Sequence, residues 1–138
     1  MKKINVIAIA ALFTITAISC KKETVPAATV TKEITVLLAA ANENPQPSGR
    51  TETGTASIKV FSDKSVTVDI TITGLASSDN ITAGHFHVGD PVTNGGVVVD
   101  LNPTVMGNMV KAKLTNVRSS FIDTLMNGTA DIYLNVHS

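Results

Sequence analysis

The sequence of 138 residues has no tryptophan, one tyrosine and one cysteine, and neither sign of charge is in excess. A protein that binds nucleic acid by neutralising phosphates carries a surplus of Lys and Arg, whereas here 11 basic residues balance 11 acidic ones. Aromatic residues, at 4% of the chain, are too few for a base-stacking platform. The lone cysteine rules out an intrachain disulfide. We therefore expect no nucleic-acid partner.

Valine, isoleucine and threonine are abundant and together make up a third of the chain. These β-branched residues favour strands, while Glu, Gln and Arg, which favour helices, are scarce. The length suits one domain and not two. The composition thus predicts a single all-β domain and excludes a helical bundle or a coiled coil.

The first twenty residues follow the three-part pattern of an export signal. A basic start, Met1-Lys2-Lys3, precedes an uncharged stretch at residues 6–18, which is too short to cross a bilayer as an ordinary helix. The stretch ends at Ala17-Ile18-Ser19-Cys20, which resembles the lipobox of bacterial lipoproteins, although Ala17 stands where leucine is usual. The resemblance implies that residues 1–19 are removed and that Cys20 is acylated. An ordinary secretory signal with a chance cysteine is the alternative.

A lipid on Cys20 predicts an exported protein of the bacterial cell envelope, with the membrane as its first partner. More than one acyl chain gives stable anchoring. Lys21, where inner-membrane lipoproteins have Asp, favours the outer membrane. Residues 20–32 are rich in Thr, Ala, Val and Lys and predict a tether. A further protein or envelope partner and the oligomeric state stay open.

From residue 33 onward, short β-rich segments alternate with turn clusters. The clearest pair, residues 55–60 and 66–73, flanks a tight turn and predicts a hairpin. Residues 119–126 carry a helical signal, with Ser119 as N-cap and Gly128 as stop. The remaining strands are expected at residues 34–39, 81–88, 97–101, 109–114 and 132–137.

Seven short strands and one helix predict an antiparallel β-sandwich of the immunoglobulin-like, Greek-key type. The apolar residues Val97, Val98 and Val99, together with Leu101, predict a buried central strand. The domain is expected to cover residues 33–138.

Several stretches, in the same order along the chain, resemble the chordin-type (CHRD) domain. Its opening is similar to Glu43-Asn44-Pro45 followed by Gly54-Thr55-Ala56. Its central T-A-x-H-I-H-x-G signature resembles residues 82–89, TAGHFHVG, and its N-G-P-V-V-V-x-L stretch resembles residues 94–101, NGGVVVDL. Its G-x-x-Y-x-N-V-H ending resembles residues 128–137. The likeness covers residues 34–138.

The resemblance implies a β-sandwich-like fold with no established enzymatic activity. Family members continue into a further strand after the N-V-H element, so residues 33–138 are expected to lack the last strand or to be a fragment. An unpaired sheet edge beside residues 132–137 would follow. We expect a lipid-anchored envelope protein that displays a binding or structural module.

All three histidines of the chain fall in predicted strands. His85 and His87 are two residues apart, so both project from one face while Phe86 points to the core. His137 lies on the polar face of the last strand. Imidazoles two apart on a strand can converge on one ion. One hypothesis is therefore a copper or zinc site made by His85, His87 and His137, with Asp90 or water as the fourth ligand.

The other hypothesis is that the histidines are structural and hydrogen-bond loop backbone, Asp90 or Asn135. The His-x-His pair is similar to the copper strand of copper-zinc superoxide dismutases, but the further ligands, the zinc loop and the cysteine pair are missing. No serine stands in a nucleophile-elbow context, and the glycines at residues 89–96 suit turns and not a phosphate cradle. The sequence therefore predicts no enzyme.

Overall fold

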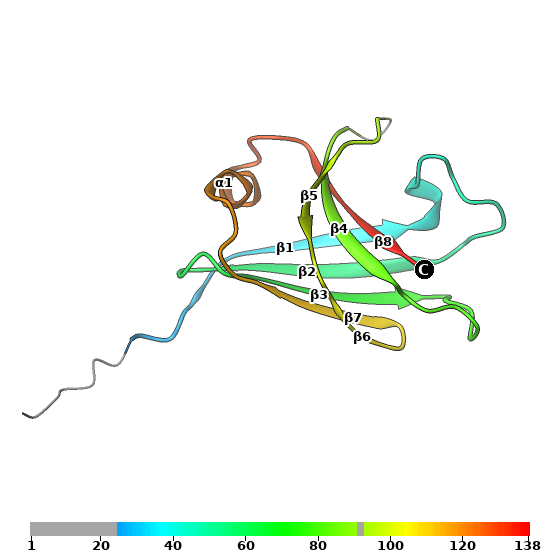
Figure 1. Ribbon diagram of the computed structural model, residues 1–138, viewed down its shortest axis with the longest axis horizontal. Helices are drawn as coiled ribbons and strands as arrows, with labels where there is room; N and C mark the ends of the chain where they lie inside the picture. Colours follow the sequence, from blue (N-terminus) through cyan, green and yellow to red (C-terminus); the bar gives the residue numbers. More distant parts are fainter. Residues whose placement is uncertain (1–24, 91–92) are drawn as a thin grey trace, which may run out of the picture.

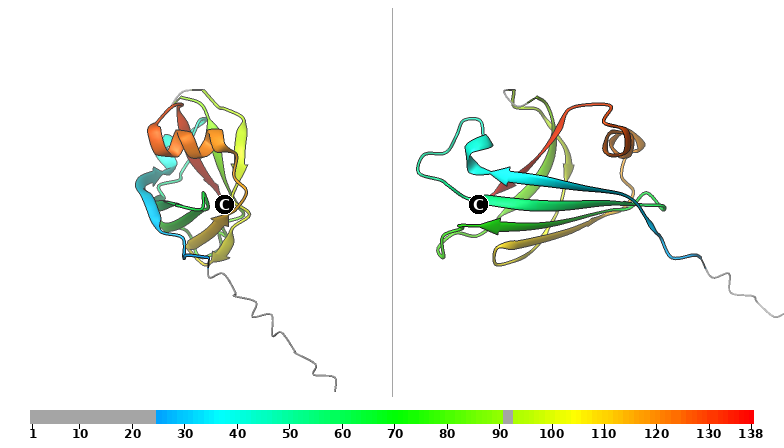
Figure 2. Two further views of the ribbon diagram at one scale, coloured as in Figure 1. Left: turned by 90° about the vertical axis from the view of Figure 1, so that its left-hand side faces the viewer. Right: turned by 180° about the vertical axis from the view of Figure 1, so that it is seen from behind.

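The computed structural model describes residues 25–90 and 93–138. Two antiparallel sheets lie face to face (Figures 1 and 2). The large sheet has five strands in the order β1-β2-β3-β7-β6, and the small sheet has three in the order β5-β4-β8. The predicted all-β sandwich with one short helix is thus confirmed. The elements are β1 (Val30–Ala39), a 3-10 turn (Ala40–Asn42), β2 (Thr53–Phe61), β3 (Val66–Thr73), β4 (Ala83–Val88), β5 (Val97–Asp100), β6 (Thr104–Met106), β7 (Met109–Leu114), α1 (Ser119–Asn127) and β8 (Ile132–His137).

The predicted hairpin is formed by β2 and β3, and a hydrogen-bonded turn joins them. Asp63 Oδ1 accepts hydrogen bonds from the hydroxyl of Ser65 at 2.7 Å and from its backbone N–H at 2.9 Å. These bonds favour the charged carboxylate and lower the pKa of Asp63 below its usual value. Their contribution to stability is present above the unfolded-state pKa and is lost as the pH falls through the folded-state pKa.

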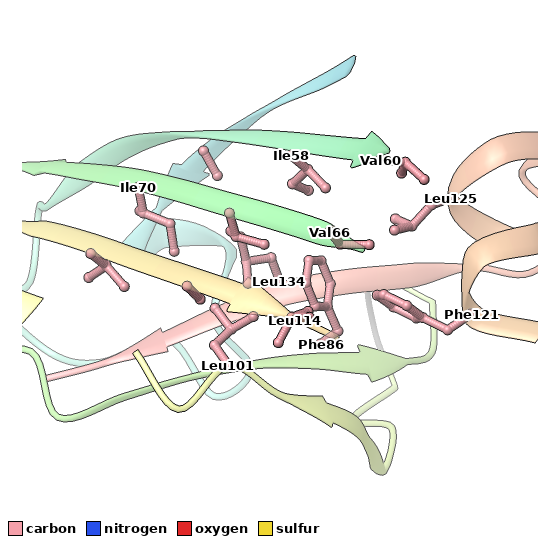
Figure 3. Packing of buried hydrophobic residues seen from close by; sticks show 14 of the residues in the cluster. Ile58, Val60, Val66, Ile70, Phe86, Leu101, Leu114, Phe121, Leu125 and Leu134 are labelled. Carbon is pink, nitrogen blue, oxygen red and sulfur yellow. The ribbon is translucent and has the colours of Figure 1, made fainter. Parts of the chain in front are cut away.

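The core lies between the two sheets and is filled by alternate residues of their strands (Figure 3). Phe86 of β4, 2% exposed, meets the ring of Phe121 edge-on, with ring centroids 5.0 Å apart. Alternation with period two explains this core, because every second residue of β2, β3 and β7 points inward. The buried apolar residues are Ala56, Ile58, Val60, Val66, Val68, Ile70, Ile72, Ile81, Phe86, Leu101, Val110, Ala112, Leu114, Phe121, Ile122, Leu125 and Leu134.

Helix α1 closes the end of the sandwich where β1 begins (Figure 1). It buries Phe121, Ile122 and Leu125 on one face, which is the amphipathic pattern of a helix on a core. Gly128 ends it in the left-handed region, with φ of 65°, and donates its N–H to the carbonyl of Thr124. The predicted stop is therefore confirmed. The prediction that Ser119 is the N-cap is wrong, because Ser119 is the first helical residue.

Three further details of the sequence-based expectation are wrong. Strand β1 begins at Val30, so the last residues of the predicted tether belong to the large sheet. Strand β5 lies at the edge of the small sheet, with Val97 54% exposed, and is not a buried central strand. Strand β6, which was not predicted, is only three residues long. In each case the result depends on which strands pair with one another, and the sequence of one segment does not contain this information.

One side of the sandwich is open. Strands β1 and β8 are each paired on one edge only in the described part of the chain. A groove of about 1090 Å³ runs between them, and its lining includes the half-buried Ile34, Val36 and Leu38 as well as the core residues Ile58 and Phe86. In residues 25–90 and 93–138, no helix combines the length and apolar character needed to cross a membrane.

The same substitution at two leucines tests this assignment of core and surface. Leu101 is 2% exposed, so Leu101→Ala should lower the free energy of unfolding by about 2–5 kcal/mol through lost burial and a residual cavity. Leu37 is 77% exposed, and Leu37→Ala should change it by less than about 0.5 kcal/mol. Urea unfolding of both variants measures the difference. Equal effects would contradict the packing described here.

Candidate metal centre

Strand β4 divides its side chains between the core and the outer face of the small sheet. Gly84 and Phe86 are buried on the inner face, while His85 and His87 are half-buried on the outer face. This is the division that the sequence predicted. The two histidines therefore project in the same direction, away from the core.

Pairing with β8 brings the third histidine to the same face. In the β4–β8 register, Ala83 is opposite His137, His85 is opposite Asn135 and His87 is opposite Tyr133. His137 thus sits diagonally across from His85, and their ring centroids are 5.2 Å apart. One nitrogen from each of the three imidazoles lies within 4.8 Å of the other two. The structure brings together three of the four predicted metal-site residues.

His87 is held by a loop and by an aromatic ring. Its Nδ1 lies 3.0 Å from the carbonyl oxygen of Gly95, in the loop between β4 and β5. The ring of Tyr133 stacks on the imidazole, with centroids 4.9 Å apart and planes 7° apart. The Tyr133 hydroxyl also accepts the N–H of Gly95 at 3.1 Å. Tyr133 therefore supports both the ring of His87 and the loop that bonds it.

His85 faces a carboxylate of β5 on its other side, beyond hydrogen-bonding distance. Asp100 is directly opposite His85 in the β4–β5 register, and its Oδ2 lies 3.8 Å from His85 Nε2. Asp100 Oδ1 accepts the N–H of Asn102 at 2.9 Å, which fixes the carboxylate. The pairing of β4 with β5 shifts by one residue between Phe86 and His87. Such an irregularity changes the direction of neighbouring side chains.

Each histidine of β4 keeps one ring nitrogen without a partner. Nδ1 of His85 and Nε2 of His87 are buried and make no hydrogen bond in the described residues. Buried polar atoms are nearly always satisfied in folded proteins, so these two nitrogens are candidate ligand atoms. Three imidazole nitrogens within 4.8 Å of one another are a donor set that suits zinc or copper.

A cleft of about 950 Å³ reaches the ring of His87 between the β4–β5 loop and the turn after β1. Among its described lining residues there are three carboxylates and no lysine or arginine, a balance that favours a cation. The lining residues are Ala41, Asn42, Glu43, Asn44, His87, Gly89, Asp90, Thr93, Asn94, Gly95, Asp131, Ile132, Tyr133 and Asn135.

Asp90, the predicted fourth ligand, lies in this cleft but outside the group of three histidines. Its carboxylate accepts the backbone N–H and the hydroxyl of Thr93, at 2.8 and 3.2 Å, and so shapes the loop. Asn135 lies opposite His85 in the β4–β8 register, and its side chain makes no hydrogen bond to the imidazole. The predicted lipidation site, Cys20, lies outside the described residues.

Sequence reasoning missed the supporting roles of Asp100, Gly95 and Tyr133. Tyr133 carried a signal, because it is the only tyrosine and alternates with His137 on the same strand face. The contacts of Asp100 and Gly95 depend on the irregular β4–β5 pairing and on the path of a loop, for which no short sequence pattern exists.

The family model of the CHRD domain matches residues 34–138. This match includes all three histidines together with Gly95, Asp100 and Tyr133, and it confirms the resemblance seen in the motifs. No curated protein and no solved structure matches the chain.

Two adjacent glycines test the role of the loop. A Cβ on Gly95 would overlap the carbonyl oxygen of Val88, whereas a Cβ on Gly96 would meet nothing within 4 Å. Gly95→Ala should displace the loop, break the contact with His87 and shift the ring resonances of His87 and Tyr133 in NMR spectra. Gly96→Ala should leave these resonances in place. Identical spectra for the two variants would show that Gly95 does not hold His87.

Proposed function

Because the chain belongs to the CHRD domain family, we propose that it is a non-catalytic binding module, that lipid on Cys20 anchors it to the outer membrane of a bacterial cell envelope, and that its ligand is a transition-metal ion. The observation that carries the choice of ligand is the convergence of His85, His87 and His137 to within 4.8 Å. The membrane attachment is supported by the lipobox-like sequence alone.

Three imidazoles suit copper or zinc better than calcium or magnesium, which prefer oxygen ligands. With metal–nitrogen bonds of about 2.0–2.1 Å, nitrogens around a tetrahedral zinc stand about 3.3 Å apart. The present spacing of up to 4.8 Å therefore has to close by about 1.5 Å on binding. His137 can supply this movement, because it is exposed and lies at the end of an edge strand.

Water suits the fourth coordination position better than Asp90. The carboxylate of Asp90 is engaged with Thr93, so its recruitment would cost two hydrogen bonds of the loop. A site with three protein ligands keeps one position open to solvent or to an added ligand.

Two single-residue substitutions in the lipobox-like sequence test the lipid anchor. Cys20→Ser removes the thiol that would carry the lipid and should move the protein from the membrane fraction to the soluble fraction. It should also abolish labelling by radioactive palmitate. Ser19→Ala, which keeps a small residue before the cysteine, is the matched control and should stay labelled and membrane-bound. Firm membrane attachment of Cys20→Ser would refute the anchor.

Metal binding is tested by isothermal titration of the Cys20→Ser protein with zinc and with copper(II). One ion per chain is expected, with a dissociation constant below about 1 µM, and copper should bind more tightly than zinc. His85→Ala combined with His87→Ala should abolish binding, while Thr71→Ala on the exposed face of β3 should not alter it. Unchanged binding in the double variant, or only weaker binding in the parent, would refute the site.

A further inference from the structure

The surroundings of His87 fix which of its nitrogens carries the proton. Its Nδ1 lies 3.0 Å from the carbonyl oxygen of Gly95, which can only accept a hydrogen bond. Nδ1 must therefore be the protonated nitrogen of the neutral ring, and Nε2 carries the lone pair. Nε2 is the buried nitrogen without a partner. The available ligand atom of His87 is Nε2.

The surroundings of His85 are the reverse. Here Nε2 faces the carboxylate of Asp100 at 3.8 Å, and a negative charge favours the proton on the nearer nitrogen. The lone pair then lies on Nδ1, which is buried and without a partner. The available ligand atom of His85 is Nδ1.

We infer that the site is a mixed chelate, in which His85 ligates through Nδ1 and His87 through Nε2, and that Asp100 and Tyr133 are the positioning residues that commit the two rings to these roles. The inference rests on the metal binding proposed above. Asp100 acts on His85 across the β4–β5 pair, and Tyr133 acts on His87 through the Gly95 loop. Neither residue needs to touch the ion.

This arrangement explains how two neighbours on one strand reach a common ion. Side chains two apart on a strand start roughly 7 Å apart at their bases, which exceeds the separation of two ligands on one metal. Nδ1 is the ring nitrogen next to the chain, and Nε2 is the distal one. With one ring of each kind, the two histidines differ in reach and meet the ion from different heights above the sheet.

The first test uses the metal-free protein. Long-range proton–nitrogen NMR spectra, recorded at a pH where the rings are neutral, distinguish the two tautomers of each imidazole. We expect His87 as the Nδ1–H form and His85 as the Nε2–H form. In the protein loaded with cadmium-113, one-bond metal–nitrogen couplings should appear at Nδ1 of His85 and at Nε2 of His87. Coupling at Nε2 of His85 would overturn the assignment even if the metal binds.

The second test removes the positioning groups. Asp100→Asn keeps the shape of the side chain and should weaken zinc binding about 10–100-fold, with loss of the single His85 tautomer. Asp69→Asn is the matched control, because it removes the same charge from an exposed ion pair with Lys111 on the large sheet. Its zinc affinity should stay within about twofold of the parent, since an exposed distant charge is screened.

Tyr133→Phe separates the hydroxyl from the ring. The stacked ring remains, but Gly95 loses its hydrogen-bond acceptor, so His87 should populate both tautomers and zinc should bind about 10–100-fold more weakly. If zinc binds the parent but both Asp100→Asn and Tyr133→Phe behave like Asp69→Asn, the inference is wrong and the proposed function stands. If the metal-free tautomers are as expected but zinc does not bind, the proposed function fails, and the contacts are structural.

Discussion

The antiparallel pairing of β4 with β8 decides both the core and the candidate site. Phe86 is directly opposite Leu134, and both are buried, while the residues beside them on the two strands face outward. Because side chains alternate with period two, a slip of one residue would expose Phe86 and bury the histidines. Burial of Phe86 against Leu134 and Phe121 therefore holds the register that assembles the three imidazoles. The buried apolar residues of the small sheet therefore determine which side chains lie on its outer, polar face.

This dependence explains how much of the molecule could be predicted from the sequence. The outward face of β4 and β8 could be predicted from the sequence, because His85, His87 and His137 alternate with apolar neighbours. The position of β5 could not be predicted, since its three valines suit a buried central strand as well as an edge strand. Only the order of strands in the sheet shows that β5 lies at an edge. Strand β6, with three residues, is too short to show a period.

The same difference between local alternation and strand pairing separates the candidate ligands from the residues that position them. A histidine on a strand face is determined by alternation, but the partner of its second nitrogen comes from another segment. Asp90, close to His87 in sequence, turns to Thr93 instead, whereas Asp100 and Gly95 reach the rings through pairing and a loop. Ligand atoms follow local periodicity, and the groups that orient them follow tertiary structure.

The position of the site relative to the open side of the sandwich gives the proposed ion a mechanical consequence. Among the described strands, β8 pairs with β4 alone, and its other edge faces the groove beside β1. An ion shared by β4 and His137 would link the end of this edge strand to its neighbour β4. Edge-strand ends are among the first parts of a sheet to open. In the unfolded chain, the same chelate requires closure of a loop from residue 87 to residue 137, so the proposed ion would bind the folded state preferentially and would stabilise it.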